Sequence, residues 1–425
     1  SYILRNKADS TVQQGNIIVD LQGGEVTGDI YAGGYQENAS AISTASTTVK
    51  IDADVSLTGT NQVISGGYKS EIGTSTVTGD RTLVFTGTQE RSGVTFTDFD
   101  TITVDGTDKV TIDTLAANSD MSKQGSGTLV IADNYEGNGS TDISGTLVLG
   151  KHGVAITQDN AQASAQLIGS GAYAADISDY EIRNAQTVVT NENGLHLGNK
   201  LTNTNVENAG TGTLVITHED NTLNSVHATK GDVEVYGKQH HELQDITIGD
   251  GLSLAFMSTG MEGGVDESHE ASISVSGSAE FGHNATLVAD IDVKSGSELT
   301  LHDVAHMGSD VTLNNGITLS GELYEQALTL TEIGEYVVLF DSVDVLILND
   351  GSSLSSYTPG ALLLSDEVQA GTYFSNLSGM GHLYITFEST TDSNGETSGE
   401  VRLTIGAVPE PTTATLSLLA LAALA

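Results

Sequence analysis

The stretch KQGSGTLVIADNYEGNGSTDISGTLVLG, residues 123–150, contains the pattern that decides the predicted fold. Two short runs of Thr, Leu, Val and Ile, residues 128–131 and 146–149, each follow a glycine, and the gap between them is rich in Asp, Asn, Gly and Ser. β-Branched and aliphatic residues favour strands, whereas the residue types in the gap favour turns. The stretch therefore predicts a strand, a turn region and a second strand.

The pattern recurs in weakened form over residues 208–237. The glycines that precede the two strands of the first copy, Gly127 and Gly145, are 18 residues apart, and their counterparts Gly212 and Gly231 are 19 residues apart. A near-constant period of this length is typical of arrays in which one coil stacks on the next. The sequence therefore predicts an all-β solenoid.

The first copy resembles the autotransporter-associated β-strand repeat of bacterial passenger domains. The residues that carry this resemblance are Lys123, Gly125, Gly127, Thr128, Leu129, Asn134, Tyr135, Gly137, Gly139, Thr141, Ile143, Gly145, Thr146, Leu147 and Gly150. The second copy keeps Gly212, Thr213, Leu214 and Gly231, and Asn208 stands where the lysine is expected. The resemblance implies a right-handed parallel β-helix outside a Gram-negative cell, and it implies no catalytic activity and no cofactor.

Composition suits thin apolar layers and excludes several classes of partner. The 425 residues include 49 Gly, no Trp and 5% aromatic residues, so layers of Val, Ile and Leu are expected in place of a deep globular core. The formal net charge of −41 repels phosphate backbones, which excludes nucleic acid as a partner. The absence of Cys excludes disulfides, thiol catalysis and cysteine zinc sites.

Short strands bounded by Gly, Asp or Asn are predicted over most of residues 11–120 and 243–321. An array of antiparallel β-sandwiches is the alternative, because such an array also consists of short strands. Residues 159–166 and 172–182 are rich in Ala and loosely helical, and we expect them to pack beside the array. The passenger-like repeat domain is predicted to span residues 1–321.

Residues 322–406 are predicted to form a β-rich cap. The alternating runs 382–387 and 400–405 flank a polar, glycine-containing loop at residues 390–399, so a hairpin is expected there. Without a cap, the last coil of a solenoid leaves an unpaired strand edge and an exposed apolar layer.

The tail, residues 407–425, resembles a PEP-CTERM sorting signal. The motif residues are Val408, Pro409, Glu410 and Pro411, and the apolar run LSLLALAALA follows at residues 416–425. The resemblance implies a short apolar C-terminal helix, transient membrane contact, and a sorting protease and export machinery as partners. Ten residues form a helix of about 15 Å, which is too short for a bilayer of about 30 Å. An apolar tail without a sorting role is the alternative.

The histidines do not predict a metal site, and the chain has no nucleotide-binding motif or nucleophile elbow. His302 and His306 would share a face only on a helix, whereas the preceding residues favour a strand. The adjacent His240 and His241 point to opposite faces of an extended chain. We therefore expect no metal and no cofactor.

Five carboxylates, Asp98, Asp100, Asp105, Asp108 and Asp113, fall close together in the sequence, with the basic residues Arg91 and Lys109 nearby. A carboxylate pair on a β-helix face is the arrangement that polysaccharide lyases and glycoside hydrolases use. A solvated acidic face is the alternative interpretation.

The sequence as a whole favours an exported structural or adhesive protein of the cell surface, outer membrane or extracellular space, binding a glycan or host surface through exposed loops. The alternatives are a carbohydrate-active enzyme on the same fold and a matrix component without a specific ligand.

Overall fold

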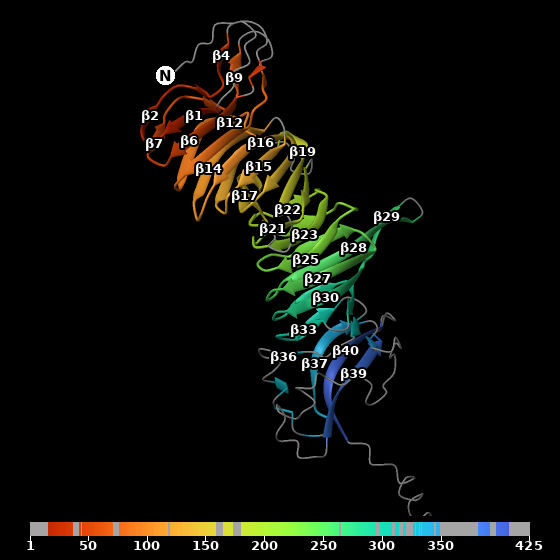
Figure 1. Ribbon diagram of the computed structural model, residues 1–425. Helices are drawn as coiled ribbons and strands as arrows, with labels where there is room; N and C mark the ends of the chain where they lie inside the picture. The colour runs from red at the N-terminus through yellow and green to blue at the C-terminus, as the bar shows by residue number, and fades with distance from the viewer. Residues whose placement is uncertain are drawn as a thin grey trace, which may run out of the picture. The chain divides into compact units, whose positions relative to one another are not determined.

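The computed structural model of the chain describes residues 16–36, 42–43, 45–70, 76–117, 120–158, 165–172, 180–262, 265–294, 297–307, 311–313, 318–319, 326–327, 329–330, 332, 334–343, 346–348, 381–391 and 397–407. Within these ranges the chain is almost entirely β-strand, and its long sheets are mostly parallel (Figure 1). The predicted all-β class is confirmed. The predicted domain boundary at residues 321–322, the motif residues 408–411 and the apolar run 416–425 lie outside the described residues.

The chain forms two compact units, residues 1–224 and 225–425. The elements of the first unit are β1 (Asn16–Leu21), β2 (Gly24–Val26), β3 (Ile30–Tyr31), β4 (Gly34–Gln36), β5 (Ile42–Ser43), β6 (Ser46–Asp52), β7 (Val55–Leu57), β8 (Gln62–Ser65), β9 (Tyr68–Ser70), β10 (Thr76–Val77), β11 (Arg81–Thr86), β12 (Gln89–Thr97), β13 (Thr101–Val104), β14 (Lys109–Ala117), β15 (Met121–Gln124), β16 (Thr128–Ile143), β17 (Thr146–Leu149), the 3₁₀ turn η1 (Gly150–His152), β18 (Val154–Gln158), β19 (Ala165–Ala172), β20 (Tyr180–Arg183), β21 (Ala185–Val189), β22 (Leu195–Leu197), β23 (Leu201–Asn208) and β24 (Leu214–Ile216). Strand β25 (Thr222–Ala228) contains the boundary between the units.

Parallel strands in the first unit are offset by about one predicted period. In the pair of β11 and β13, Leu83 lies opposite Ile102, and in the pair of β14 and β16, Val110 lies opposite Leu129. Strands β16 and β17 are also parallel, with Leu129 opposite Leu147, and all five side chains are fully buried. The two strands predicted in the opening stretch are therefore parallel neighbours in one ladder.

The region predicted as a turn between these two strands is instead a continuation of β16. This strand runs to Ile143, pairing in parallel with β14 through Asn134 opposite Thr114 and in antiparallel fashion with β19. The ring of Tyr135 is 1% exposed, and its hydroxyl is hydrogen-bonded to Thr141. The prediction of a turn was wrong because β14 and β19 supply backbone hydrogen bonds on the two sides of the strand. These bonds outweigh the poor strand propensity of Gly, Asn and Asp.

Antiparallel pairing interrupts the parallel pattern between β16 and β21. The antiparallel pairs are β16–β19, β17–β18, β18–β21 and β19–β20. The loosely helical character predicted for residues 159–166 and 172–182 is therefore wrong where the chain is described, because these residues belong to β19 and β20. Alternate side chains such as Leu167 and Ile182 are buried, so the period of two outweighs the helix propensity of Ala.

Lys123 is a buried cation held by backbone carbonyls. Its side chain has no exposed surface, and its ammonium donates to the carbonyl oxygens of Gly125 at 2.8 Å, Ser144 at 2.7 Å and Gly127. The three N–H donors of the ammonium thus match three acceptors. Burial lowers the pKa of Lys123 to about 8, although the nearby Asp105 opposes the shift, so the side chain is still charged at neutral pH.

The second copy of the repeat meets the same need with an amide. Asn208 is fully buried and donates from Nδ2 to the carbonyl oxygen of Gly212 at 2.8 Å, four residues on, as Lys123 does to Gly127. In the first copy a side chain at Gly145 is excluded, because φ is +70° and a Cβ atom would lie 2.8 Å from Lys123 Nζ. The two copies are therefore structurally equivalent at this position.

We expect Lys123→Met to lower the free energy of unfolding by about 3 kcal/mol, because the carbonyl groups that faced the ammonium lose their donor in a buried site. Urea unfolding followed by circular dichroism measures the difference. Lys50→Met is the matched control, since Lys50 is an exposed strand residue in the same unit.

The pH dependence gives a second readout for the same variant. The pKa of Lys123 is about 8 in the folded chain and has the ordinary lysine value of 10.5 in the unfolded chain, so the folded chain binds this proton less tightly. The free energy of unfolding of the wild type should therefore rise relative to Lys123→Met by about 1 to 2 kcal/mol between pH 8 and pH 10. A constant difference across this range would contradict the burial of the charged group.

The strands of the second unit are β26 (Val233–Gly237), β27 (His240–Ile248), β28 (Ser253–Glu262), β29 (Val265–Glu270), β30 (Ser272–Phe281), β31 (Thr286–Val288), β32 (Asp290–Val293), β33 (Glu298–Leu301), β34 (Ala305–Met307), β35 (Val311–Leu313), β36 (Thr318–Leu319), β37 (Tyr336–Val343), β38 (Leu346–Leu348), β39 (Gly381–Thr391) and β40 (Thr397–Ala407). Parallel pairing places Ile248, Phe281 and Leu301 in one buried row across β27, β30 and β33. A second parallel series runs through β26, β28, β31, β34 and β37.

The hairpin predicted from residues 382–387 and 400–405 is confirmed. Strands β39 and β40 pair in antiparallel fashion, with Leu383 opposite Ile405, and β40 pairs with β37 on its other side. The strands extend to Thr391 and from Thr397, so the connecting loop is shorter than the predicted one. The parallel series of the second unit therefore passes into an antiparallel hairpin at β37 (Figure 1).

Candidate functional site

The structure assigns separate structural contacts to the carboxylates that lie close together in the sequence. Asp98 accepts a hydrogen bond from the hydroxyl of Ser65 at 2.8 Å. Asp100 forms an ion pair with Arg81, whose Nε donates to it at 2.8 Å. The carboxylate of Asp105 opposes the lowering of the Lys123 pKa.

Asp108 and Asp113 accept hydrogen bonds from backbone N–H groups about 20 residues earlier in the chain. Asp108 accepts from the Gly87 N–H at 3.0 Å, and Asp113 accepts from the Gly93 N–H at 2.5 Å. Of the two basic residues, Lys109 is exposed, whereas Arg91 is 7% exposed.

The guanidinium of Arg91 contacts uncharged acceptors. It donates to the backbone carbonyl oxygens of Val55 at 2.5 Å and Asp52 at 2.9 Å, and to the side-chain carbonyl of Gln89 at 2.7 Å. Arg91 is therefore built into the backbone of its unit, and it does not approach the candidate carboxylates through any of these bonds.

Backbone capping between neighbouring strands is a general use of Asp in this chain. A carboxylate in or beside one strand accepts a hydrogen bond from a backbone N–H in or beside a paired strand, at a strand end or a register shift. The capping residues and the N–H groups they accept from are Asp29 (Val63), Asp100 (Arg81), Asp108 (Gly87), Asp113 (Gly93), Asp120 (Ser140), Asp232 (Ser253), Asp245 (Ser278) and Asp250 (His283). These side chains satisfy donors that the ladder leaves without a partner.

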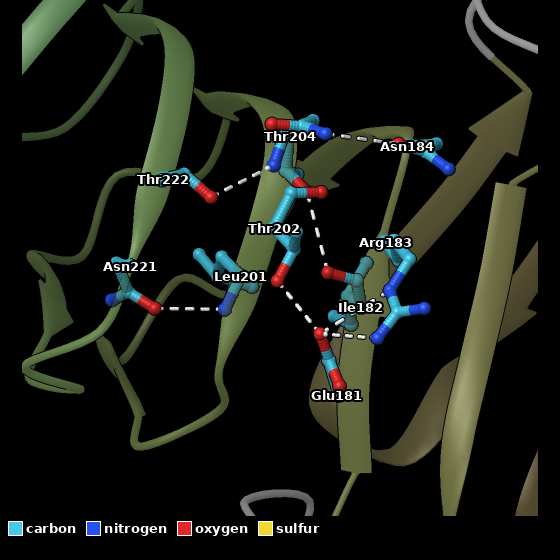
Figure 2. A network of polar contacts seen from close by, with 10 residues as sticks. Glu181, Ile182, Arg183, Asn184, Leu201, Thr202, Thr204, Asn221 and Thr222 are labelled. Carbon is cyan, nitrogen blue, oxygen red and sulfur yellow. Dashed lines mark hydrogen bonds and ion pairs between the residues drawn. The ribbon is translucent and has the colours of Figure 1, made fainter.

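Figure 2 shows the same principle with uncharged groups in the first unit. Asn221 accepts from the Leu201 N–H at 2.7 Å, and Asn203, which has a φ of 50°, donates from Nδ2 to Asn184 Oδ1 at 3.4 Å. Asn184 has a φ of 52°, a conformation that Asn adopts more readily than most residues. Side-chain amides thus join positions 19 residues apart on parallel neighbours of the sheet.

Glu181 lies in this network. Its carboxylate accepts from the hydroxyl of Thr202 at 2.7 Å and forms an ion pair with Arg183 at 3.0 Å. Burial raises the pKa of Glu181, but the hydrogen bonds from Thr202 and Arg183 outweigh burial and leave the pKa below its usual value. The position of Glu181 therefore favours the charged form in a structural role.

We expect Asp245→Ala to lower the free energy of unfolding by about 1 to 2 kcal/mol. Asp245 Oδ1 accepts from both the backbone N–H and the hydroxyl of Ser278 at 2.8 Å, and Ala leaves both donors without this acceptor. Asp245→Asn is the matched control, because its amide oxygen can still accept. Urea unfolding that shows equal losses for the two variants would contradict a capping role.

The adjacent histidines lie as the extended chain predicts. His240 is exposed and its Nδ1 lies 2.8 Å from the hydroxyl of Ser272, whereas His241 is 4% exposed and its ring is 5.1 Å from that of Phe256. His241 Nε2 has no hydrogen-bond partner within the described ranges. Burial, together with the positive charge of Lys238, lowers the pKa of His241 to about 4.

Acid should therefore destabilise the fold through His241. In the unfolded chain His241 takes up a proton near pH 6.5, whereas in the folded chain it stays neutral to about pH 4. Between pH 7 and pH 5 the wild type should lose about 2 kcal/mol of unfolding free energy relative to His241→Leu. Urea unfolding at the two pH values measures this difference, and parallel curves for the two proteins would refute it.

The other two candidate histidines have different partners. His302 Nε2 lies 2.8 Å from Glu280, and His306 Nδ1 lies 2.6 Å from Asp341. His302 follows β33 and His306 lies in β34, so they are on separate elements, in agreement with the expectation that they do not share a helix face. Among the residues that the structure describes, no group of three or more His, Asp or Glu side chains is arranged to hold a metal.

A hollow of about 310 Å³ lies at the corner that follows β27, β30 and β33. It is lined by Thr247, Ile248, Gly249, Asp250, Glu280, Gly282, His283 and His302. The buried row of Ile248, Phe281 and Leu301 aligns the three strands, so that the residues after each strand meet at one place. The hollow therefore lies entirely within the second unit.

Two imidazole–carboxylate pairs give the hollow its polarity. His302 pairs with Glu280, and His283 Nδ1 lies 3.3 Å from Asp303. Gly282 allows Asp250 to approach, because a Cβ atom there would lie 2.6 Å from Asp250 Oδ1. Such a surface offers both donors and acceptors, which suits a ligand rich in hydroxyl groups.

This hollow was missed by sequence reasoning. Glu280 lies 33 residues after Thr247, and His283 lies 33 residues after Asp250. This spacing is longer than the predicted period. The available signal was the pair of short polar segments, Gly249–Asp250 and Gly282–His283, that follow apolar strands. That spacing could have placed them at equivalent corners.

No helix within the described ranges has the length and apolar character needed to cross a membrane. The sequence matches no protein-family model, and comparison with curated proteins and with solved structures finds no match. Function is therefore inferred from the residues and from the geometry of these sites.

Proposed function

We propose that the chain is an exported, non-catalytic structural or adhesive protein of a Gram-negative cell surface, or one released from it. In this proposal each unit is built around a right-handed parallel β-helix, and exposed groups at the coil corners bind an extracellular glycan or host surface. Residues 322–406 close the helix as a cap, and residues 407–425 act as a sorting tail for export machinery and a sorting protease.

The observation that carries the proposal is the one-period offset of the parallel strands. Leu83 opposite Ile102 and Leu129 opposite Leu147 are the pairings expected when each coil lies on the preceding one. Left-handed Asn residues at 184 and 203 mark equivalent corners of successive coils. The right-handed sense follows from the strong preference of parallel β crossovers for that hand.

The backbone contacts of the acidic residues support a binding role over a catalytic one. Asp100, Asp108 and Asp113 contact the backbone of neighbouring coils, so their carboxylates serve the architecture. The exported location and the sorting protease rest on the resemblance of residues 123–150 and 408–411. The equivalence of Lys123 and Asn208 is consistent with a passenger-like repeat.

A carbohydrate-active enzyme is the second candidate, and the hollow of the second unit favours it. Two carboxylates, Asp250 and Glu280, line this hollow together with His283 and His302. The pairing of Glu280 with His302 at 2.8 Å could move a proton to or from a bound hydroxyl group.

A glycan panel combined with a reducing-end release assay distinguishes these functions. For an adhesive protein we expect retention of at least one glycan without release of new reducing ends. Glu280→Gln should then leave the reducing-end signal at background, as should the control Glu242→Gln, whose side chain is exposed on β27.

Release by the wild type that Glu280→Gln abolishes and Glu242→Gln preserves would replace the adhesive proposal with the enzymatic one. If the wild type neither retains a glycan nor releases reducing ends, a matrix component without a specific ligand is favoured.

A further inference from the structure

One aromatic side chain of the second unit is unusually open to solvent. Tyr336, the first residue of β37, is 47% exposed, whereas the rings of Phe281 and Phe340 in the same unit are at most 1% exposed. Among the described residues, the large apolar or aromatic side chains with this degree of exposure are Tyr336 and Ile18. An exposed ring lacks the stabilisation that burial would provide. Exposure of a large aromatic side chain is therefore typical of a ligand-recognition site.

The ring is held in a fixed orientation by Arg402 of β40. The guanidinium carbon lies 4.0 Å from the ring centroid, and antiparallel pairing places Arg402 opposite Val338, diagonal to Tyr336. Arg402 itself is held by Glu400, which accepts from Nε at 2.7 Å and from Nη2 at 2.6 Å, and by an ion pair with Glu388 of β39. A cation–π contact of this kind covers one ring face and leaves the other available.

The carboxylates that hold Arg402 are open to solvent on the same sheet. The side chain of Glu388 is 60% exposed and that of Glu400 is 40% exposed, whereas Arg402 is 19% exposed. Carboxylate oxygens have more acceptor sites than their bonds to one guanidinium use, so they can accept from ligand hydroxyl groups. An open ring face on the same sheet as such acceptors is complementary to an extended ligand that has apolar faces and hydroxyl groups in successive units.

Charge narrows the class of ligand. The net charge of −41 and the two glutamates disfavour an anionic ligand. The acidic surface attracts cations in general, but the ring adds little to this attraction because Arg402 already engages it, so ring recognition does not select a cation. A neutral oligosaccharide meets both conditions, since the C–H face of one pyranose can pack on the ring while hydroxyl groups of a neighbouring unit reach the carboxylates.

We propose that Tyr336, Arg402, Glu388 and Glu400 form a binding platform for a neutral saccharide. The platform lies on β37, β39 and β40 (Figure 1), and its residues are separate from those that line the hollow after β33. This inference rests on the adhesive function proposed above and supplies it with a site and a ligand class.

The test measures binding of the full chain to immobilised neutral hexasaccharides, namely cellohexaose, chitohexaose, laminarihexaose and mannohexaose. For the hexasaccharide that the wild type binds, Tyr336→Ala should raise Kd at least about tenfold, which corresponds to about 1.4 kcal/mol. Tyr336→Phe should keep Kd within about twofold, because the ring is retained. Tyr236→Ala is the matched control, since Tyr236 is a half-buried strand tyrosine of the same unit whose hydroxyl donates to Glu234.

A second variant, Glu388→Gln, covers the case in which Tyr336→Ala fails to fold. Its side chain is largely exposed, and we expect a threefold to tenfold rise in Kd with an unchanged circular dichroism spectrum. Binding by the wild type that neither Tyr336→Ala nor Glu388→Gln weakens overturns the platform and leaves the adhesive function standing. Failure of the wild type to bind any hexasaccharide overturns the platform. Failure on the wider glycan panel as well overturns the adhesive function.

Discussion

The structure depends on the need to satisfy backbone hydrogen-bonding groups wherever a strand ends and the chain turns. Within a parallel ladder the backbone N–H and C=O groups pair with the neighbouring strands, but the corners where the chain turns have no such regular pairing. In this chain the corners are satisfied by side chains: Asp accepts from N–H groups, and Lys123 and Asn208 donate to carbonyl oxygens. Paired segments are thereby bonded at the turns as well as along the strands.

This constraint explains part of the acidic composition. An excess of Asp and Glu is usually ascribed to a solvated surface, and part of it has that role here. The carboxylates of Asp108, Asp113 and Asp245 nevertheless accept backbone hydrogen bonds, so their number follows in part from the number of strand ends and register shifts. An acidic cluster in a repetitive β sequence is therefore weak support for catalysis.

Much of the fold could be predicted from strand periodicity. The strands at residues 128–131 and 146–149 and the hairpin formed by β39 and β40 were predictable, because alternation and flanking glycines are local signals. The second half of β16 and strand β19 were not, because their conformation depends on pairing between segments distant in the sequence. Composition alone favours turn and helix in these two segments.

The candidate sites were less predictable than the fold, for a related reason. Glu280, His283 and His302 come together only because three strands are in register, and the 33-residue spacing between two of those strands departs from the shorter period of the opening stretch. Tyr336 and Arg402 are far apart in the sequence and meet across an antiparallel pair. Register of this kind is a property of the folded sheet, so no local motif reports it.

Burial of basic side chains against backbone carbonyl groups has a consequence for turnover of the protein. A protease of trypsin-like specificity must draw an extended Lys or Arg side chain into its own pocket. The chain has only 15 such residues, and two of them, Arg91 and Lys123, are enclosed by backbone carbonyl groups. Around these positions cleavage requires prior unfolding, so the folded protein resists digestion there in a protease-rich environment.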